Sequence, residues 1–287
     1  MFALSILSTN KGVLRFSQSA RNVHHHLKGI AALANSVWLD SSPEWRAGIA
    51  LPQVEVAKVG TIKVSRTVKQ ATDNFARLRQ RMVTAQLRAR GISDRRVLAA
   101  MLVVLREEFV PEALKKEAYN DGALPIADGQ TISQPFTVAY MAEAAGLHGH
   151  EKILEVGTGS GYGAAVLSLL GADIHSIERI PALGLQATAT LKRLGYSTVH
   201  VHMGDGSLGL AAEAPFDAII VTAGAAYLPP AYTEQLAEGG RIIIPIGQYE
   251  TNQHLYRFRR DRGKMSMGDL GAFAFVPLIG DESWHPA

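Results

Sequence analysis

The chain has 287 residues, of which 47% are hydrophobic and 19% are charged, so it is long enough for one large domain or two small ones. It contains no cysteine, which excludes disulfides, zinc ribbons and thiol catalysis and fits a reducing, cytoplasmic compartment. No apolar run approaches the roughly 18 residues that a membrane span needs, so we expect no membrane partner.

The positive charge of the chain lies in its first quarter. Residues 1–75 carry nine Lys or Arg and four Asp or Glu, whereas residues 76–287 carry twenty and twenty-two. Residues 1–75 also show weak periodicity, so we predict a basic, poorly ordered N-terminal extension followed by a folded domain over residues 76–287. The folded part offers no extended positive field, which argues against a nucleic-acid partner. The run His24–His26 lacks partner ligands at metal-site spacing, so no metal site is predicted.

Two helices are expected at the start of the folded part. The segment FARLRQRMVTAQLRAR (75–90) predicts a basic helix that ends at Gly91. Its apolar face is expected to contain Leu78, Met82, Ala85 and Leu87. Ser93 or Asp94 can cap the second helix. The apolar residues expected on that helix are Val97, Leu98, Met101, Leu102 and Leu105.

A turn, a loop and a third helix follow. Pro111 is expected to open a short turn. Residues 119–133 are rich in Gly, Asp and Pro and predict a loop. Pro135 then stands where a helix would begin, and this helix is expected to continue to Gly146.

From Glu151 onward, short apolar strands alternate with helices. The expected strands cover residues 152–156, 173–177, 198–201, 217–222 and 241–246, and the expected helices cover residues 161–170, 183–194 and 230–236. Continuous apolar strands between helices indicate a parallel sheet that is buried on both faces. We therefore predict an α/β fold with a doubly wound, mostly parallel sheet, N-terminal helices and a C-terminal antiparallel hairpin. The two strands of the hairpin are expected near residues 254–260 and 272–278.

A glycine-rich loop follows the first of these strands. In the segment ILEVGTGSGYGAA (153–165), the glycines are Gly157, Gly159 and Gly161. Glycine is needed at such a turn because the backbone must bend sharply and let a ligand approach closely. The dinucleotide fingerprint G-x-G-x-x-G would place its third glycine at position 162, which is Tyr162. The spacing therefore disfavours a nicotinamide cofactor.

Three acids lie at the ends of three successive strands. Glu155 precedes the glycine loop, where it would suit a cationic ligand such as the amino group of a methionine moiety. Glu178 ends the next strand, where a carboxylate can accept hydrogen bonds from both ribose hydroxyls. Asp205 follows the third strand, where an adenine edge would lie. Each acid alone could be a solvated charge, but all three meet at the ligand-binding edge of a parallel sheet. The pattern predicts S-adenosyl-L-methionine as the cofactor.

Six segments of the folded part match one protein family in the same order along the chain. They are RMVTAQLRARGISDRRVLAAM (81–101), REEFVPE (106–112), YNDGALPIADGQTISQPFTVAYM (119–141), APFDAIIVTA (214–223), LAEGGRIIIPIG (236–247) and FVPL (275–278). Over roughly residues 76–280 the chain resembles the protein-L-isoaspartate O-methyltransferase family, which has the class I, Rossmann-like methyltransferase fold. The resemblance implies transfer of a methyl group to the free α-carboxylate of L-isoaspartyl residues in damaged proteins, which starts their repair through a succinimide.

The resemblance also implies roles for individual residues. Ser133 is expected beside the reacting carboxylate as the catalytic residue and also near the cofactor. The backbone of Thr131 and Ile132 is expected to line the sulfonium end of the cofactor. The other cofactor contacts that the resemblance implies are Gly157, Glu178, Asp205 and Gly206. From its position alone, Ser133 could also cap the helix that begins at Pro135, and the two roles are compatible.

The chain departs from the family pattern at three positions. Leu105 stands where the family usually has proline, Phe136 where many members have histidine, and Ala274 where an arginine is common. The missing arginine removes a charge that could face the substrate or support the structure. None of the three positions belongs to the glycine loop.

Two other readings of the sequence remain open at this point. The glycine loop would also fit a class I methyltransferase that acts on RNA or on a small molecule. A non-catalytic, cofactor-binding scaffold with a basic arm is a further alternative, and residues 1–75 are its support. We expect a monomer, because no long exposed apolar stripe is left over.

Overall fold

The computed structural model describes residues 66–171, 173–248 and 253–284. Residues 1–65 of the extension expected at residues 1–75, including His24–His26, lie outside these ranges, so their expected disorder stays a prediction. Residues 66–75 instead belong to the first helix, which begins nine residues earlier than expected. Among the described helices, none is long and apolar enough to cross a lipid bilayer. The same residues contain no group of three or more His, Asp or Glu that could hold a metal ion.

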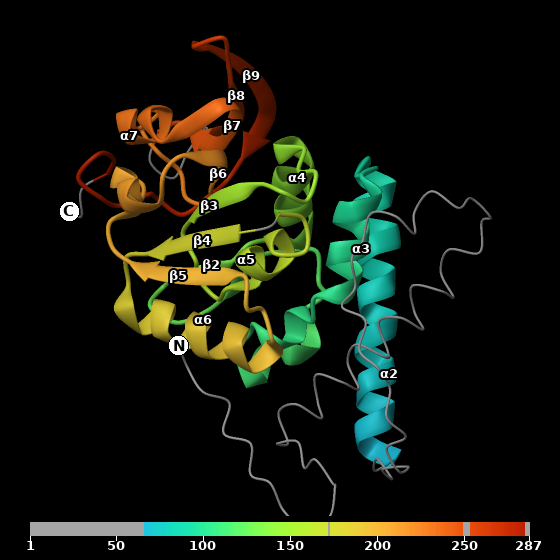
Figure 1. The fold of residues 1–287 in the computed structure, drawn as a ribbon. Coiled ribbons are helices and arrows are strands. Elements are labelled where there is room, and N and C mark those ends of the chain that lie inside the picture. Colours follow the sequence, from blue (N-terminus) through green and yellow to red (C-terminus); the bar gives the residue numbers. More distant parts are fainter. Residues whose placement is uncertain (1–65, 172, 249–252, 285–287) are drawn as a thin grey trace, which may run out of the picture. The chain divides into compact units, whose positions relative to one another are not determined.

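A seven-stranded sheet forms the centre of the fold, in the order β5-β4-β3-β6-β7-β8-β9 (Figure 1). Its strands are β3 (Lys152–Val156), β4 (Asp173–Glu178), β5 (Val199–Met203), β6 (Phe216–Val221), β7 (Leu236–Ile246), β8 (Gln253–Asp261) and β9 (Lys264–Phe273). The first five strands in this order are parallel, and β8 and β9 are antiparallel. The predicted α/β fold with a C-terminal antiparallel pair is confirmed. The chain order reverses between β3 and β6, and such a switch point is where open α/β sheets bind ligands.

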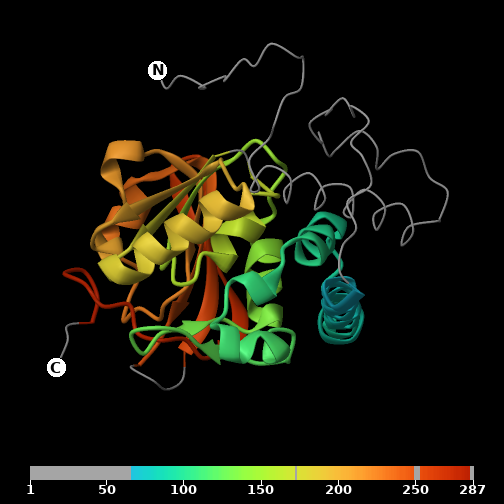
Figure 2. The same ribbon diagram turned by 90° about the horizontal axis from the view of Figure 1, so that it is seen from below.

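Helices cover both faces of this sheet. They are α3 (Arg95–Val103), α4 (Pro135–Ala145), α5 (Tyr162–Leu167), α6 (Pro181–Leu194) and α7 (Pro230–Glu234), whereas α2 (Arg66–Arg81) packs against α3. One buried cluster joins α3, α4 and α5 to one face of the sheet, and a second joins α7 to the other. Figure 1 shows α4 and α7 on opposite sides of the strands, and Figure 2 shows α6, in yellow, packed against them.

The first helix changes its winding at Met82. The α-helix α2 continues as a π-helical segment (Met82–Leu87) and a 3₁₀ turn (Arg88–Arg90), and ends at Gly91 with φ of 97°. The expected end at Gly91 is confirmed. The expected apolar face is wrong at Ala85, which is exposed, whereas Val83 is buried. The wider π turn rotates the side chains relative to the 3.6-residue period on which the prediction relied.

The expected loop at residues 119–133 contains a small hairpin. Its strands are β1 (Leu124–Pro125) and β2 (Thr131–Ile132), with Leu124 opposite Ile132. The third helix begins at Pro135 and ends at Gly146, as expected. Two-residue strands are too short to show a period, which is why the hairpin was not predicted.

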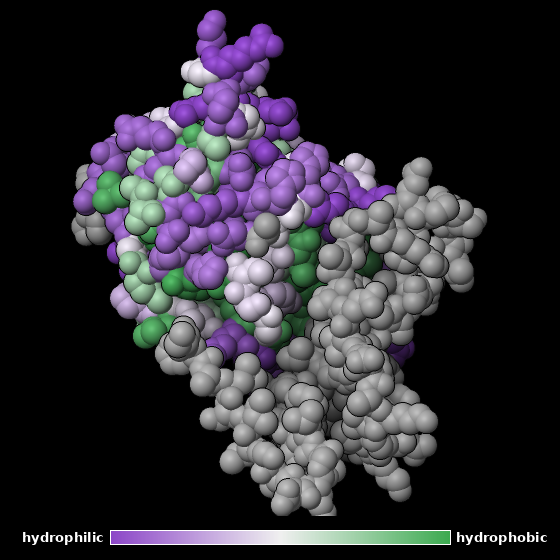
Figure 3. Space-filling view, viewed as in Figure 1, coloured by the Kyte–Doolittle hydropathy of each residue, from purple (hydrophilic) through white to green (hydrophobic). Residues whose placement is uncertain are grey.

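The end of the sheet differs from the prediction in two ways. β7 begins at Leu236 rather than at Arg241, and a bulge between Leu236 and Arg241 shifts its register with β6. The last strand covers Lys264–Phe273, whereas the strand expected near residues 272–278 is wrong. β9 is an edge strand with mostly exposed side chains, so it lacks the apolar signature of a buried strand. Figure 3 shows the projecting end of the β8–β9 hairpin as a hydrophilic surface.

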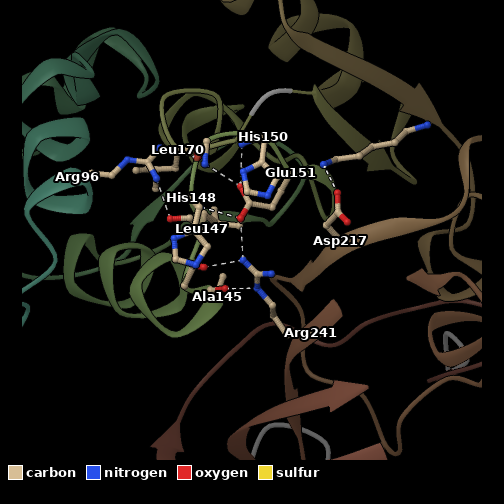
Figure 4. A network of polar contacts seen from close by, with 12 residues as sticks. Arg96, Ala145, Leu147, His148, His150, Glu151, Leu170, Asp217 and Arg241 are labelled. Carbon is tan, nitrogen blue, oxygen red and sulfur yellow. Dashed lines mark hydrogen bonds and ion pairs between the residues drawn. The ribbon is translucent and has the colours of Figure 1, made fainter. Parts of the chain in front are cut away.

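The buried carboxylate of Glu151 connects the end of α4 and strand β7 to the start of β3 (Figure 4). Glu151 accepts hydrogen bonds from the backbone N–H groups of His148, Gly149 and His150 at 2.7, 2.8 and 3.1 Å. It also forms an ion pair with Arg241 of β7 at 3.1 Å, and Arg241 donates to the carbonyl groups of residues 145 and 146 at the end of α4. These bonds lower the pKa of Glu151 to about 2, although burial of its side chain opposes the shift.

Candidate functional site

A pocket lies where β3, β4 and β6 end, at the switch point of the sheet. Three parallel strands contribute Glu155–Ser160, Ile177–Ile180 and Thr222–Ala223, and Gly206 lies between them. Two other segments complete its wall, residues 130–133 around β2 and Phe275–Ile279 after β9. The pocket therefore combines the predicted glycine loop with part of the segment GQTISQP (129–135), which we call the recognition loop.

Two of the three loop glycines line the pocket, and both have a positive φ, which favours glycine. Gly157 has φ of 95°, and a Cβ atom there would lie 2.4 Å from the Oγ1 atom of Thr222. Gly159 has φ of 51°, and its N–H donates to Glu178 at 2.9 Å. Gly161 is not among the residues that line the pocket; it caps α5 and packs against Leu191 of α6.

Glu155 is a buried acid at the floor of the pocket. It is 1% exposed and accepts a hydrogen bond at 2.6 Å from the hydroxyl of Ser176, which lies 2.6 Å from the hydroxyl of Thr158. Burial raises the pKa of Glu155 to about 8, the bond from Ser176 opposes the shift, and the nearby Glu178 adds to it. A bound cation beside a buried acid with a raised pKa would stabilise the ionised carboxylate and pair with it.

Of the other two predicted acids, Glu178 lines the pocket and Asp205 does not. Glu178 lines the pocket and accepts hydrogen bonds from the N–H groups of Gly159 and Ile180, each at 2.9 Å. A carboxylate has about four acceptor sites, so two remain for a ligand. Asp205 does not line the pocket, and its carboxylate accepts from the N–H groups of Ser207 and Asp281 at 2.9 and 2.7 Å. Its expected contact with adenine stays a prediction.

The recognition loop reaches the pocket through Thr131, Ile132 and Ser133. Ile132 is 3% exposed and anchors β2 in the core, which turns Thr131 and Ser133 to the opposite side. The N-cap of α4 is Gln134 rather than Ser133, and its side chain makes no capping bond. The alternative role of Ser133 as the helix cap is therefore wrong.

Arg106 holds this loop from behind. It is fully buried and donates one hydrogen bond to the carbonyl oxygen of Ser133 and another to that of Ala118, both at 2.7 Å. Its guanidinium lies 4.8 Å from the ring centre of Tyr162. Burial lowers the pKa of Arg106, and the neighbouring Tyr162 and Tyr119 oppose the shift. Arg106 was not predicted as a site residue, although it belongs to the segment REEFVPE (106–112) that matches the family.

Two further contributions were also missed. Ser176 and Thr158 bond to Glu155 or to each other, but nothing in their local sequence marks them. Phe275–Ile279 was expected to form part of a strand and instead closes the pocket. The N–H of Gly224 donates to the carbonyl of Val276 at 2.7 Å, and the N–H of Leu278 donates to the carbonyl of Gly224 at 2.8 Å.

Comparison with known proteins identifies the family of the chain. The sequence model of the protein-L-isoaspartate(D-aspartate) O-methyltransferase family matches residues 78–283.

The chain belongs to this family.

The chain aligns with curated members of the family over nearly their whole length. The protein-L-isoaspartate O-methyltransferase 1 of Syntrophobacter fumaroxidans is 51% identical over 212 residues, which cover 74% of this chain and 99% of the relative. The protein-L-isoaspartate O-methyltransferase 2 of Marinobacter nauticus is 51% identical over 208 residues, covering 72% and 95%. The enzyme class expected from the sequence, an O-methyltransferase, is confirmed.

Solved structures support the same family. One protein-L-isoaspartate O-methyltransferase has a TM-score of 0.64 and 30% identity, with 71% of this chain and 67% of that chain covered. A Plasmodium falciparum protein described as a member of the family has a TM-score of 0.59 and 26% identity, with 71% and 98% covered. That structure is a complex with S-adenosyl-L-homocysteine.

Proposed function

We propose that this protein transfers the methyl group of S-adenosyl-L-methionine to the free α-carboxylate of L-isoaspartyl residues in damaged proteins. One observation carries the proposal: residues 130–133 of the segment GQTISQP, within the region that matches the family, line the same pocket as the glycine loop and Glu155. This part of the pocket wall therefore faces the cofactor on one side and can hold the acceptor on the other.

The residues of the pocket fit the cofactor. Buried Glu155 suits the cationic amino group, Glu178 keeps acceptor sites for the ribose hydroxyls, and Gly157 leaves no space for a side chain. When bound, S-adenosyl-L-methionine supplies a methyl group that is already activated by a positively charged sulfur. The roles of these residues, like those of Gly159, Gly206 and Asp205, are part of the proposal.

Ser133 and the backbone beside it would hold the acceptor carboxylate. Ser133 is half-buried and lies on the shared wall, and Arg106 fixes its carbonyl from behind. A carboxylate with an ordinary pKa near 3.5 is ionised at neutral pH, so it needs no general base. The task of the protein is then to align the two reactants and to exclude water, for which Phe275–Ile279 provides the cover.

The methyl ester that results is a better electrophile than the carboxylate, because its methoxy group can leave as methanol. The neighbouring backbone nitrogen then displaces methanol and closes a succinimide without the enzyme. Hydrolysis of the succinimide reopens part of it as normal aspartate. The protein thus carries out one step, and the damaged chain completes the repair by its own chemistry.

The proposal is tested with a matched pair of peptides that differ only in having isoaspartate or aspartate. We expect base-labile label from S-adenosyl-L-methionine on the isoaspartyl peptide alone. Label on an RNA or a small molecule, with neither peptide labelled, would overturn the proposal in favour of another class I substrate. Cofactor binding without transfer to any acceptor would favour the alternative of a non-catalytic, cofactor-binding scaffold.

The monomeric state that we expect from the sequence stays a prediction.

The role of Ser133 is tested by Ser133→Ala. We expect kcat to fall about 10- to 100-fold with little change in cofactor affinity, because one donor to the carboxylate is lost. Ser168→Ala is the matched control: Ser168 is also half-buried, but it bonds to the carbonyl of Ala165 at 2.8 Å, away from the pocket. Equal kcat in Ser133→Ala and the parent would remove Ser133 from the mechanism.

A further inference from the structure

A second hollow adjoins the cofactor pocket on the far side of the recognition loop. It is lined by Arg90, Ala123, Thr131, Ser133, Gln134, Phe136, Thr137 and residues 272–275. Thr131, Ser133 and Phe275 line both spaces and form the wall between them. An acceptor held at Ser133 therefore has this hollow beside it. We call it the flanking hollow.

Aromatic rings form one side of the flanking hollow. Phe136 stacks on Tyr140 with ring centres 5.6 Å apart, and Tyr140 stacks on Phe273 at 5.4 Å. Phe273 in turn lies 6.2 Å from Phe275. Phe136, Phe273 and Phe275 are half-buried, so each keeps part of its surface open. An apolar side chain that entered here would cover this surface and be stabilised by its burial.

A single charged residue, Arg90, is among the residues that line the flanking hollow. Its guanidinium lies 3.7 Å from the ring centre of Phe136, which fixes it over the aromatic face. Asp121 pairs with it at 3.3 Å and is itself bound by Gln134 at 2.7 Å. Asp121 offsets part of this charge but is not part of the lining, so the charged group nearest to an entering side chain is the guanidinium of Arg90.

We propose that the flanking hollow binds the side chain of a residue directly adjacent to the isoaspartate, that its aromatic side selects an apolar side chain, and that Arg90 rejects lysine and arginine. The inference rests on the proposed function, because it places the isoaspartate at Ser133. Consecutive Cα atoms are only about 4 Å apart, so a neighbour of the bound residue cannot lie far from the shared wall. Phe136 and Arg90 are then residues that determine specificity rather than catalytic residues.

The experiment compares kcat/KM for isoaspartyl peptides that carry Leu, Ala or Lys before the isoaspartate, and for a second set that carries them after it. In one of the two sets we expect kcat/KM about tenfold higher for Leu than for Ala, with Lys no better than Ala. Three peptides within about twofold of one another in both sets would overturn the proposal. So would a preference for Lys in either set.

Variants then assign the preference to its residues. Phe136→Ala is expected to bring the ratio of Leu to Ala close to one, whereas Phe136→Leu keeps most of it. Arg90→Gln is expected to raise kcat/KM for the Lys peptide about threefold relative to Leu and to leave the ratio of Leu to Ala unchanged. Leu185→Ala is the control, because Leu185 is 66% exposed on α6 and lines neither space. Unchanged ratios in Phe136→Ala and Arg90→Gln would overturn the assignment.

The readout is a ratio between peptides, so a variant that loses overall activity still gives an answer. The two proposals also fail differently. If no isoaspartyl peptide is methylated by the parent, the proposed function fails. If all of them are methylated at the same rate, the function stands and the flanking hollow has no role in selection.

Discussion

Glu155 lies 1% exposed at the floor of the cofactor pocket, and its pKa is raised to about 8 because it is buried. Only the ionised carboxylate can pair with a cationic amino group, so binding below pH 8 must release a proton. The α-amino group of the cofactor loses its own charge near pH 8. Affinity for S-adenosyl-L-methionine is therefore expected to rise up to about tenfold per unit between pH 6 and pH 8 and to fall above it.

Calorimetric titration from pH 6 to pH 9 measures this profile. Glu155→Gln is the control, and we expect its affinity to be weaker and to lose the rise between pH 6 and pH 8. An affinity of the parent that is the same at pH 6 and pH 8 would contradict a pairing between Glu155 and the amino group.

Arg106 is expected to act through Ser133 without touching the substrate. Arg106→Lys keeps the charge but loses the fork that reaches two carbonyl groups, so the recognition loop should lose its alignment. We expect kcat to fall about tenfold and cofactor affinity to change little. Arg79→Lys is a matched control, because Arg79 is 7% exposed and donates to the hydroxyl of Tyr119 at 3.0 Å rather than to the carbonyl of Ser133. If both variants lost stability and kcat alike, the effect of Arg106 would be structural.

The central strands are the elements that the sequence predicted best. β3 begins and ends where expected, and β6 differs by one residue at each end. Both are continuous apolar runs between helices, and the pattern is strong because they are buried on both faces. β9 was misplaced because an edge strand needs no apolar side chains, and Ala85 was misplaced because a π turn has no signal in a period of 3.6.

The residues of the candidate site also divide into those in local motifs, which the sequence predicted, and those that packing brings to the site, which it did not. The glycine loop and the segment GQTISQP are local motifs, so their residues were found from the sequence and are brought together by the sheet. Arg106, Ser176 and Phe275–Ile279 reach the site from distant parts of the chain. Their contributions depend on how the elements pack, which a pattern within one segment cannot show.

The glycine loop is expected to bind the cofactor through its backbone conformation rather than through side chains. Gly159 has φ of 51°, a conformation that a β-branched residue rarely adopts. Gly159→Val is therefore expected to weaken cofactor binding about a hundredfold or more, measured by calorimetry. Gly239→Val is the matched control, because Gly239 has φ of 78° and open space around it, but lies in the bulge of β7. Cofactor affinity that is unchanged in Gly159→Val would refute this placement of the loop.

At the scale of the whole molecule, Glu151 joins the end of α4, the start of β3 and β7 (Figure 4). Its pKa of about 2 lies below the ordinary value of 4.5, so the folded state binds the proton less readily than the unfolded state. The stabilisation is present above about pH 4.5 and is lost as the pH falls towards 2. A shift of this size corresponds to roughly 3 kcal/mol of unfolding free energy.

Glu151→Gln removes this contribution and leaves Arg241 without its ion pair. We expect the variant to be less stable than the parent by about 3 kcal/mol at pH 7, with a smaller difference at pH 3. Urea unfolding at both pH values measures the two differences. Glu234→Gln, at an exposed position of α7, is expected to match the parent at both. A Glu151→Gln deficit that is as large at pH 3 as at pH 7 would show that the charge is not its cause.

The wall at Phe275–Ile279 has a consequence for how the protein is made. The ribosome completes every strand of the sheet before it adds this segment, which closes a pocket that includes the glycine loop, made more than a hundred positions earlier. A chain that ends before Phe275 has every strand of the sheet but lacks this part of the pocket wall, so we expect it to bind the cofactor more weakly than the full chain. Any protection that ligand binding gives against unfolding therefore depends on a segment that is made after the sheet.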